Sequence, residues 1–129
     1  AIFSPQSKTI KEASLLPTDQ YWVALDDGKV IGTIGLSALQ NNTVALKRFF
    51  LHKAFRGQGI SNKLLDTVVN FAIDNKISCI YLGTMIQFKA AQKFYEKNGF
   101  REIPETVLPA HFPANPVDKV FYMKELPNT

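Results

Sequence analysis

One short stretch decides the fold: Arg56-Gly57-Gln58-Gly59-Ile60-Ser61. It follows a run of apolar and aromatic residues over 43–51, which predicts a strand, and it opens a segment with apolar residues at helical spacing over 60–75, which predicts a helix. Glycines at the start of a helix let an anion approach the free backbone N–H groups there. The helix dipole adds positive potential at the same point. The stretch therefore predicts a phosphate site.

Side chains near this turn suit the same ligand, but the pattern has a second interpretation. Arg56 and Lys53 bring positive charge and Ser61 brings a hydroxyl. A glycine pair that opens a helix is also a common structural cap, and both interpretations stay open on these six residues. The stretch lacks the Gly-Lys-Ser/Thr of a Walker A loop and the third glycine of the dinucleotide fingerprint, so those two nucleotide sites are disfavoured.

The residues before the turn predict an antiparallel meander. Three strands are expected in close succession, over 21–25, 30–39 and 43–51, with turns at 26–29 and 40–42. Gly28 is expected to take a positive φ in the first turn. Ahead of the meander, the spacing of Ile10, Ala13 and Leu16 predicts a short helix over 9–16 that ends at Pro17.

The residues after the turn predict a parallel pair of strands. A compact apolar run at 77–82 follows the helix over 60–75, and strand, helix and strand together make a βαβ unit. A second helix is expected over 88–98, ending at Gly99, and two last strands at 100–103 and 119–126. Residues 104–118 hold four prolines and predict irregular structure. The fold class is mixed α/β (α+β), in a single domain over 1–129.

Composition excludes several classes of protein. The chain has 129 residues, 46% hydrophobic and 20% charged, which is typical of a globular domain. No apolar stretch approaches a membrane span, and residues 1–6 do not resemble a signal peptide. The net charge of +4 is spread along the chain, so no nucleic-acid partner and no membrane partner are expected. A single cysteine, Cys79, suits a reducing compartment, and we expect a cytoplasmic protein.

Two segments in order resemble one known family. Residues 46–65 resemble the central motif of the GNAT superfamily of acyl-CoA-dependent N-acyltransferases: Arg56 and Gly59 match it, and Ser61 stands where Gly or Ala is usual. Residues 90–100 resemble the family's second motif, a helix that carries Tyr95 and closes in Gly99-Phe100. The resemblance covers the chain from about residue 21 onward, and it implies a GNAT-like acyl-CoA N-acyltransferase fold.

The resemblance also implies a reaction and a set of site residues. The chain would be an N-acetyltransferase that moves the acetyl group of acetyl-CoA to a primary amine by direct attack. Backbone N–H groups near Phe50 and Leu51 would bind the acyl carbonyl and pantetheine, and Arg56, Gly57, Gln58, Gly59, Ile60 and Ser61 would hold the pyrophosphate. Tyr95 would protonate the departing thiolate, for which a phenol is a competent acid. Tyr95 also shares an apolar helical stripe with Phe88 and Ala91, and core packing is the structural alternative for it.

The general base is left open. Many relatives carry Glu where this chain has Ala45, so another carboxylate, His111 or a water chain are all candidates. Cys79 lies in an apolar run and is expected to pack as a small hydrophobe. His52 and His111 have no metal-ligand spacing, and we expect no metal site.

The acceptor half of the site is the least predictable part. Only about 20 residues precede the hairpin, so the family's first strand and part of its helical cap are expected to be missing or reduced. A homodimer partner is one way to complete the acceptor pocket. The alternative function is a non-catalytic acyl-CoA-binding or sensing domain, which Ala45 and the short N-terminus favour. A basic nucleic-acid-binding domain is a weaker third hypothesis.

Overall fold

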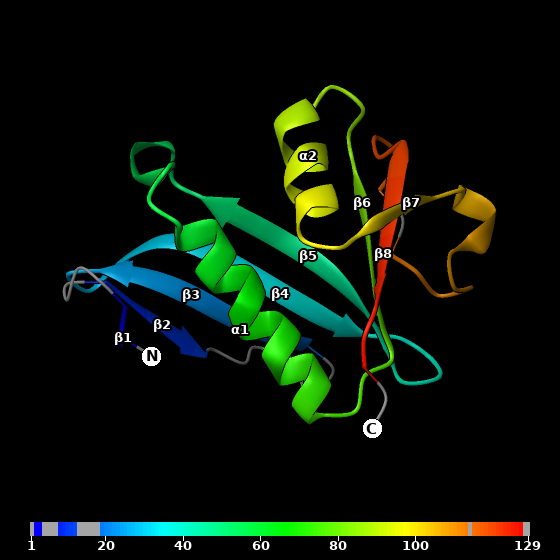
Figure 1. The fold of residues 1–129 in the computed structure, drawn as a ribbon, viewed down its shortest axis with the longest axis horizontal. Coiled ribbons are helices and arrows are strands. Elements are labelled where there is room, and N and C mark those ends of the chain that lie inside the picture. Colours follow the sequence, from blue (N-terminus) through cyan, green and yellow to red (C-terminus); the bar gives the residue numbers. More distant parts are fainter. Residues whose placement is uncertain (1, 4–7, 13–18, 114, 128–129) are drawn as a thin grey trace.

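The computed structural model describes residues 2–3, 8–12, 19–113 and 115–127. These residues form one mixed sheet of eight strands in the order β1-β2-β3-β4-β5-β6-β8-β7, with helices α1 and α2 in front of it in Figure 1. The elements are β1 (Ile2–Phe3), β2 (Lys8–Glu12), β3 (Asp19–Asp26), β4 (Lys29–Ala38), β5 (Thr43–Leu51), a 3₁₀ turn (Lys53–Phe55), α1 (Ile60–Asp74), β6 (Cys79–Thr84), α2 (Lys89–Lys97), β7 (Arg101–Ile103), a 3₁₀ turn (Glu105–Val107) and β8 (Val120–Glu125).

Strands β3, β4 and β5 form the predicted antiparallel meander. The β3–β4 hairpin closes at the pair Asp26 and Lys29, and the two residues between them, Asp27 and Gly28, have φ of 53° and 83°. Two consecutive positive φ values match the two-residue turn whose twist suits flanking strands. The prediction of a positive φ at Gly28 is confirmed.

The helix predicted over 9–16 is wrong where the structure describes it. Residues 8–12 form β2, antiparallel to β3 with Ile10 opposite Ala24. Apolar residues at 10, 13 and 16 sample too few turns to fix a helical period, and the outer edge of β3 offers unpaired backbone groups that a strand satisfies. Lys8 Nζ lies 3.7 Å from Asp26 Oδ1 at this pairing. Residues 13–16 lie outside the described part of the chain.

Strand β2 also decides one half of the expectation that the first strand is missing or reduced: the strand is not missing. A strand does precede the β3–β4 hairpin and extends the sheet by one position. Its Ile10 is 7% exposed and joins the hydrophobic core. The N-terminal region thus contributes to the sheet instead of forming a helical cap over residues 9–12.

Helix α1 buries one stripe against the meander. Ile60, Leu64, Leu65, Val68 and Ala72 recur at helical spacing and are all buried. Phe71 meets Trp22 of β3 edge to face, with ring centroids 4.9 Å apart. The helix then returns the chain to β6, which pairs in parallel with β5 as the βαβ pattern predicts.

The C-terminal third of the chain extends the sheet beyond β6, at the edge opposite β1. Strand β8 lies between β6 and β7 and is antiparallel to both. Helix α2 ends before Gly99, whose φ of 87° fits the predicted C-terminal glycine. Residues 104–113 and 115–118 are irregular as predicted, except for the 3₁₀ turn Glu105–Val107. Among the described residues, no helix is both long and apolar enough to cross a membrane.

Candidate acyl-CoA site

The sheet splits between β5 and β6. Their parallel pairing covers 43–45 against 79–81, and it stops after Ala45 and Tyr81. Both strands continue, β5 to Leu51 along β4 and β6 to Thr84 along β8. Figure 1 shows the two strands diverging, with α2 beside the opening. The split leaves a gap in the sheet along 46–51 of β5.

A bulge in β5 lies at the start of this gap. The pairing with β4 passes from Thr33–Phe50 to Gly35–Lys47, so β5 has an extra residue there. Arg48 takes a φ of 51°, and its carbonyl accepts a hydrogen bond from Thr33 Oγ1 at 2.7 Å. A bulge bends its strand and re-aims the side chains that follow. It therefore turns the end of β5 away from β6.

Backbone alternation separates the two residues predicted to bind the acyl group. His52 donates its N–H to the Ile31 carbonyl of β4 at 2.7 Å. Since backbone groups alternate along an extended strand, the Phe50 backbone also faces β4, and the Leu51 N–H faces the gap. The gap-facing donor is thus at Leu51, and the Phe50 side chain is 57% exposed.

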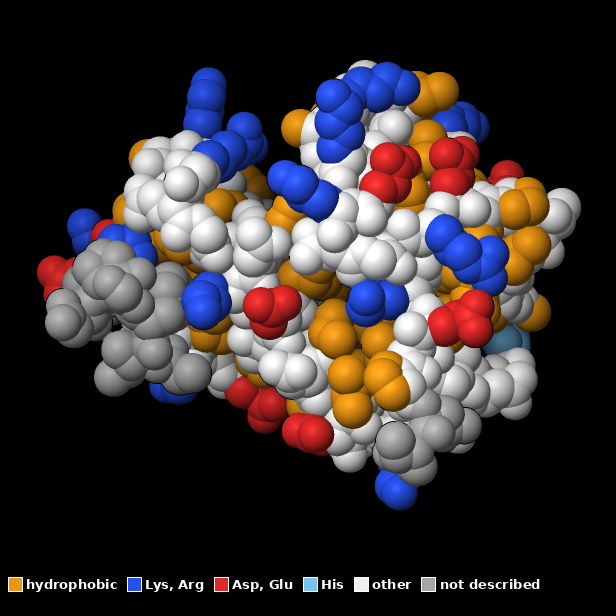
Figure 2. All heavy atoms as spheres, viewed as in Figure 1, with side chains coloured by type: hydrophobic (Ala, Val, Ile, Leu, Met, Phe, Trp, Pro, Cys, Tyr) orange, Lys and Arg blue, Asp and Glu red, His pale blue; other side chains and the backbone are white. Residues whose placement is uncertain are grey.

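A cleft of about 600 Å³ runs from this gap along α2. It brings together predicted site residues from three separate parts of the chain: β5, the turn before α1, and α2. Its lining comprises Phe49, Phe50, Leu51, Arg56, Ser61, Gln87, Phe88, Lys89, Ala90, Ala91, Phe94 and Tyr95. Figure 2 shows Lys and Arg side chains on both lobes beside the notch between the turn and the start of α2.

The glycine turn lies at the mouth of this cleft, and only some of its residues line it. Gly57, Gln58 and Gly59 are exposed beside the lining, and the Ile60 side chain is 1% exposed in the core. Gly57 and Gly59 have φ of 80° and 79°, and an added Cβ at either would meet nothing within 4 Å. The structural reason for glycine here is the left-handed backbone, not crowding by protein atoms.

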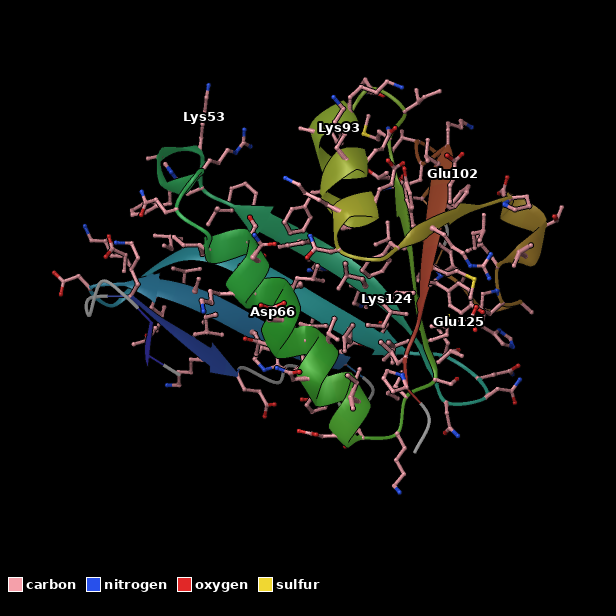
Figure 3. The ribbon with its side chains drawn as sticks, viewed as in Figure 1. Lys53, Asp66, Lys93, Glu102, Lys124 and Glu125 are labelled. Atoms are coloured by element: carbon pink, nitrogen blue, oxygen red, sulfur yellow. The ribbon has the colours of Figure 1, made fainter. Side chains whose placement is uncertain are left out.

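The N-terminus of α1 is open to a ligand. Gly59 is the N-cap, and no side chain caps the helix by a hydrogen bond. The first N–H groups of a helix lack intrahelical partners and carry the positive end of its dipole. Arg56 lies beside them on the cleft, whereas Lys53 projects outward at the tip of the preceding turn in Figure 3 and is not part of the lining.

Tyr95 lies on the opposite wall from the turn. It is 8% exposed, and its ring packs among those of Phe49, Phe94, Phe100 and Tyr122, with centroids 5.6–6.3 Å away. Burial, with a smaller contribution from the charge of Asp118, raises the pKa of Tyr95 to about 12. Among the described residues its hydroxyl has no hydrogen-bond partner. The phenol is therefore protonated at neutral pH, and the side chain both packs and faces the cleft.

The other candidates from the sequence lie elsewhere. Ala45 is a buried apolar position, and His111 is exposed outside the cleft lining. His52 Nδ1 accepts a hydrogen bond from the Ala54 N–H in the turn. Cys79 is buried, and burial raises the pKa of its thiol, which fits a packed side chain better than a nucleophile. The described residues contain no group of three or more His, Cys, Asp or Glu side chains that could hold a metal ion.

Sequence reasoning missed Asp118, the carboxylate whose charge reaches Tyr95. It lies in the proline-rich segment that the sequence reads only as irregular. No spacing rule relates residue 118 to residue 95, because β8 has to return between β6 and β7 before the two approach. The order of the strands in the sheet brings Asp118 close enough to act on Tyr95.

The fold and this cleft define an acyltransferase of the GNAT type, and the comparisons agree. The model of the acetyltransferase (GNAT) family matches residues 3–100. The chain belongs to the GNAT acetyltransferase family. A GNAT-family acetyltransferase from Staphylococcus aureus is 44% identical, with a TM-score of 0.82 over 84% of this chain and 69% of that one.

More distant and partial matches add two facts. The N-acetylaspartate synthetase of Danio rerio is 37% identical over 106 residues, which are 79% of this chain but only 37% of that protein. The chain thus spans little more than a third of that curated relative. A GNAT-family acetyltransferase from Elizabethkingia anophelis, solved with acetyl-CoA bound, shares the fold with a TM-score of 0.73 at 18% identity, over 93% of this chain and 99% of that one.

Proposed function

We propose that this domain is an N-acetyltransferase that transfers the acetyl group of acetyl-CoA to a primary amine. The observation that carries the proposal is the single cleft shared by the β5 end, Arg56 and Ser61 of the turn, and Tyr95. A helix N-terminus with a cation suits a pyrophosphate, and an apolar channel suits pantetheine. An acyl-CoA carries both chemistries in one molecule, and this cleft has both among its lining residues.

In the proposed reaction, the amine nitrogen attacks the thioester carbon across the gap. The Leu51 N–H donates to the carbonyl oxygen as negative charge develops there. The C–S bond then breaks and its electron pair leaves on sulfur, which takes the phenolic proton of Tyr95. An ammonium ion has to lose one proton to solvent before its nitrogen can attack. The nitrogen loses a second proton after the C–N bond forms, and that proton replaces the one that Tyr95 gave. The products are the N-acetyl amine and free CoA.

The raised pKa of Tyr95 suits a general acid. A phenol with a pKa of about 12 stays protonated at neutral pH and is held by rings on several sides. It can release its proton only to a strong base, and a thiolate formed in an apolar cleft, away from water, is one. The aromatic packing restricts the ring to one position along α2.

The test is thiol release from acetyl-CoA with a panel of amines. L-Aspartate comes first in the panel, because curated relatives are named N-acetylaspartate synthetase. Simple alkylamines, amino acids, amino-acid amides and lysine peptides complete it. Turnover with any of them supports the proposal. The absence of thiol release with all of them, together with CoA binding in calorimetry, would favour the non-catalytic acyl-CoA-binding domain instead.

A further inference from the structure

The gap between β5 and β6 also opens on the face of the sheet that lies away from α1 and α2. Val44 and Leu46 of β5 belong to the core cluster that α1 covers. Side chains alternate across a strand, so Ala45 and Lys47 point to the other face. On β6 the same argument holds for Gly83, because its neighbour Leu82 is in the α1 core while its cross-strand partner Phe121 is in the second cluster.

The β5 side of the gap on this far face is cationic. The Tyr21 ring covers Gly35, and both Lys47 Nζ and Arg48 Cζ lie within 6 Å of its centroid, at 5.6 and 5.9 Å. Lys47 Nζ is 2.9 Å from Asp19 Oδ2. Burial alone would lower the pKa of Lys47, but hydrogen bonds to Asp19 and Tyr21 outweigh it and raise the pKa.

Asp19 therefore neutralises Lys47, but it leaves Arg48 uncompensated. Asp19 also accepts from Ser37 Oγ at 2.7 Å, so its two carboxylate oxygens are both engaged. Among the described residues, no carboxylate forms an ion pair with Arg48. The exposed guanidinium lies over the Tyr21 ring, and within the described part of the chain no carboxylate competes with an incoming anion for it.

The β6 side of the gap is anionic. A methyl group added at Gly83 would lie 3.0 Å from Asp118 Oδ2, so the carboxylate lies over that glycine on the far face. Asp118 is half-buried, and burial raises its pKa. Among the described residues it has no ion-pair or hydrogen-bond partner for its carboxylate. Two uncompensated charges of opposite sign thus flank one opening.

The two charges lie at the same level of the sheet. Counting on from the last pair, Ala45 and Tyr81, places residues 47–48 of β5 level with residues 83–84 of β6. This is the level at which Asp118 covers Gly83. The same carboxylate acts electrostatically on Tyr95 from the far face of the sheet, so it lies near the proposed proton donor.

We propose that Arg48 on the β5 side of the gap and Asp118 on the β6 side form the acceptor site. The acceptor is an α-amino acid or another amine with an adjacent carboxylate. Asp118 holds the ammonium group beside the gap, and Arg48 holds the carboxylate. An amino-acid zwitterion carries opposite charges a few bonds apart, which matches a site with an unpaired acid and an unpaired arginine on facing sides. This inference rests on the proposed function, because it assigns the acceptor of that reaction.

The experiment compares an amino acid with its own amide. L-Alanine and L-alaninamide, and L-aspartate and its diamide, are assayed by thiol release with the wild-type protein, Arg48→Gln and Asp118→Asn. The wild type should prefer each acid over its amide by about 10- to 100-fold in kcat/KM, the range of a hydrogen bond to a charged group. An amide weakens the basicity of the neighbouring amine, which favours the amide at neutral pH, so a preference for the acid reports binding.

The two variants test Arg48 and Asp118 separately. Arg48→Gln should raise KM for the acids until acid and amide are used alike, and leave the amide and acetyl-CoA KM unchanged. Asp118→Asn should lower kcat/KM for acid and amide together, because both carry the ammonium group. Arg101→Gln is the matched control: this arginine is exposed and paired with Glu125 at 3.0 Å on the β7–β8 edge. Glutamine at position 48 faces the same positive-φ cost as arginine, so folding differs little.

Each other outcome contradicts the inference. If acid and amide are used equally, or if Arg48→Gln slows both equally, Arg48 does not bind the carboxylate of the acceptor. If alkylamines alone are acetylated, the acceptor assignment fails while the acetyltransferase function stands. If no amine is turned over, calorimetry of the CoA-loaded protein with L-aspartate and its diamide decides: equal binding of the two, or none, overturns the inference.

Discussion

The two walls of the cleft differ in exposure and in the groups that they offer. The turn 56–61 is exposed, its glycines have open space around them, and it offers backbone N–H groups. The α2 wall presents Tyr95, buried in a cluster of aromatic rings. A phosphate can be bound from the surface by backbone dipoles, whereas a proton donor has to be protonated at neutral pH and held in one position. We therefore predict that changes in the turn affect CoA binding, and that changes at Tyr95 affect the rate of acetyl transfer.

Tyr95→Phe tests this division most strongly. Loss of the hydroxyl should lower kcat by about 10²- to 10⁴-fold, the usual contribution of a general acid. The ring and its packing remain, so the CoA dissociation constant and the melting temperature should stay close to wild type. Stopped-flow thiol release and calorimetry measure the two quantities. An unchanged kcat would leave Tyr95 as a packing residue only, and an equal loss of CoA binding would break the division between the walls.

Alkaline stability gives a second measure of how buried the Tyr95 wall is. Its pKa rises from 10.0 to about 12 on folding, so its contribution to stability is complete below pH 10 and is lost as the pH rises to about 12. The full loss should be about 3 kcal/mol, at 1.36 kcal/mol for each pKa unit, and roughly 2 kcal/mol of it is reached by pH 11.5. Urea unfolding at pH 8 and pH 11.5 measures it. Tyr95→Phe should lose less folding stability between these two pH values than the wild type. The raised pKa of Tyr122 contributes to the loss in both proteins.

Gly59→Ala tests the turn, with Gly28→Ala as its matched control. Both glycines have a left-handed backbone, φ 79° and 83°, and open space at the Cβ position. Each substitution should cost about 1–2 kcal/mol of folding stability for the same conformational reason. Only Gly59→Ala should also weaken CoA binding, because the proposed pyrophosphate site lies at that backbone. Equal CoA affinity in the two variants would reduce the turn to a structural cap.

Arg56→Gln carries the smallest expected effect. Arg56 lines the cleft, whereas Lys53 points outward from the same turn (Figure 3), so Lys53→Gln is the control. Arg56→Gln should weaken CoA binding by about tenfold and make it less sensitive to salt, since one charge-assisted contact is lost. Lys53→Gln should change the affinity far less. Equal losses in both would indicate a diffuse positive field instead of a defined phosphate contact.

The sequence predicted most of the elements because their patterns are local. The α1 stripe, the positive φ at Gly28 and the end of α2 at Gly99 all depend on neighbours within a turn or two of the chain. The helix prediction for residues 9–16 was wrong for the opposite reason. Its three apolar residues do not fix a period, and the unpaired edge of β3 decided the conformation of residues 8–12. That edge exists only once the meander has formed.

By itself, the sequence determined the order of strand, turn and helix, the positive φ at Gly28, and the family to which the chain belongs. Short-range spacing carries all of this. The tertiary structure alone decided where β5 and β6 part, which strand-end N–H faces the gap, and how β8 brings Asp118 near Tyr95. These features depend on register and sheet order between segments tens of residues apart, and no local pattern of side chains encodes such distances.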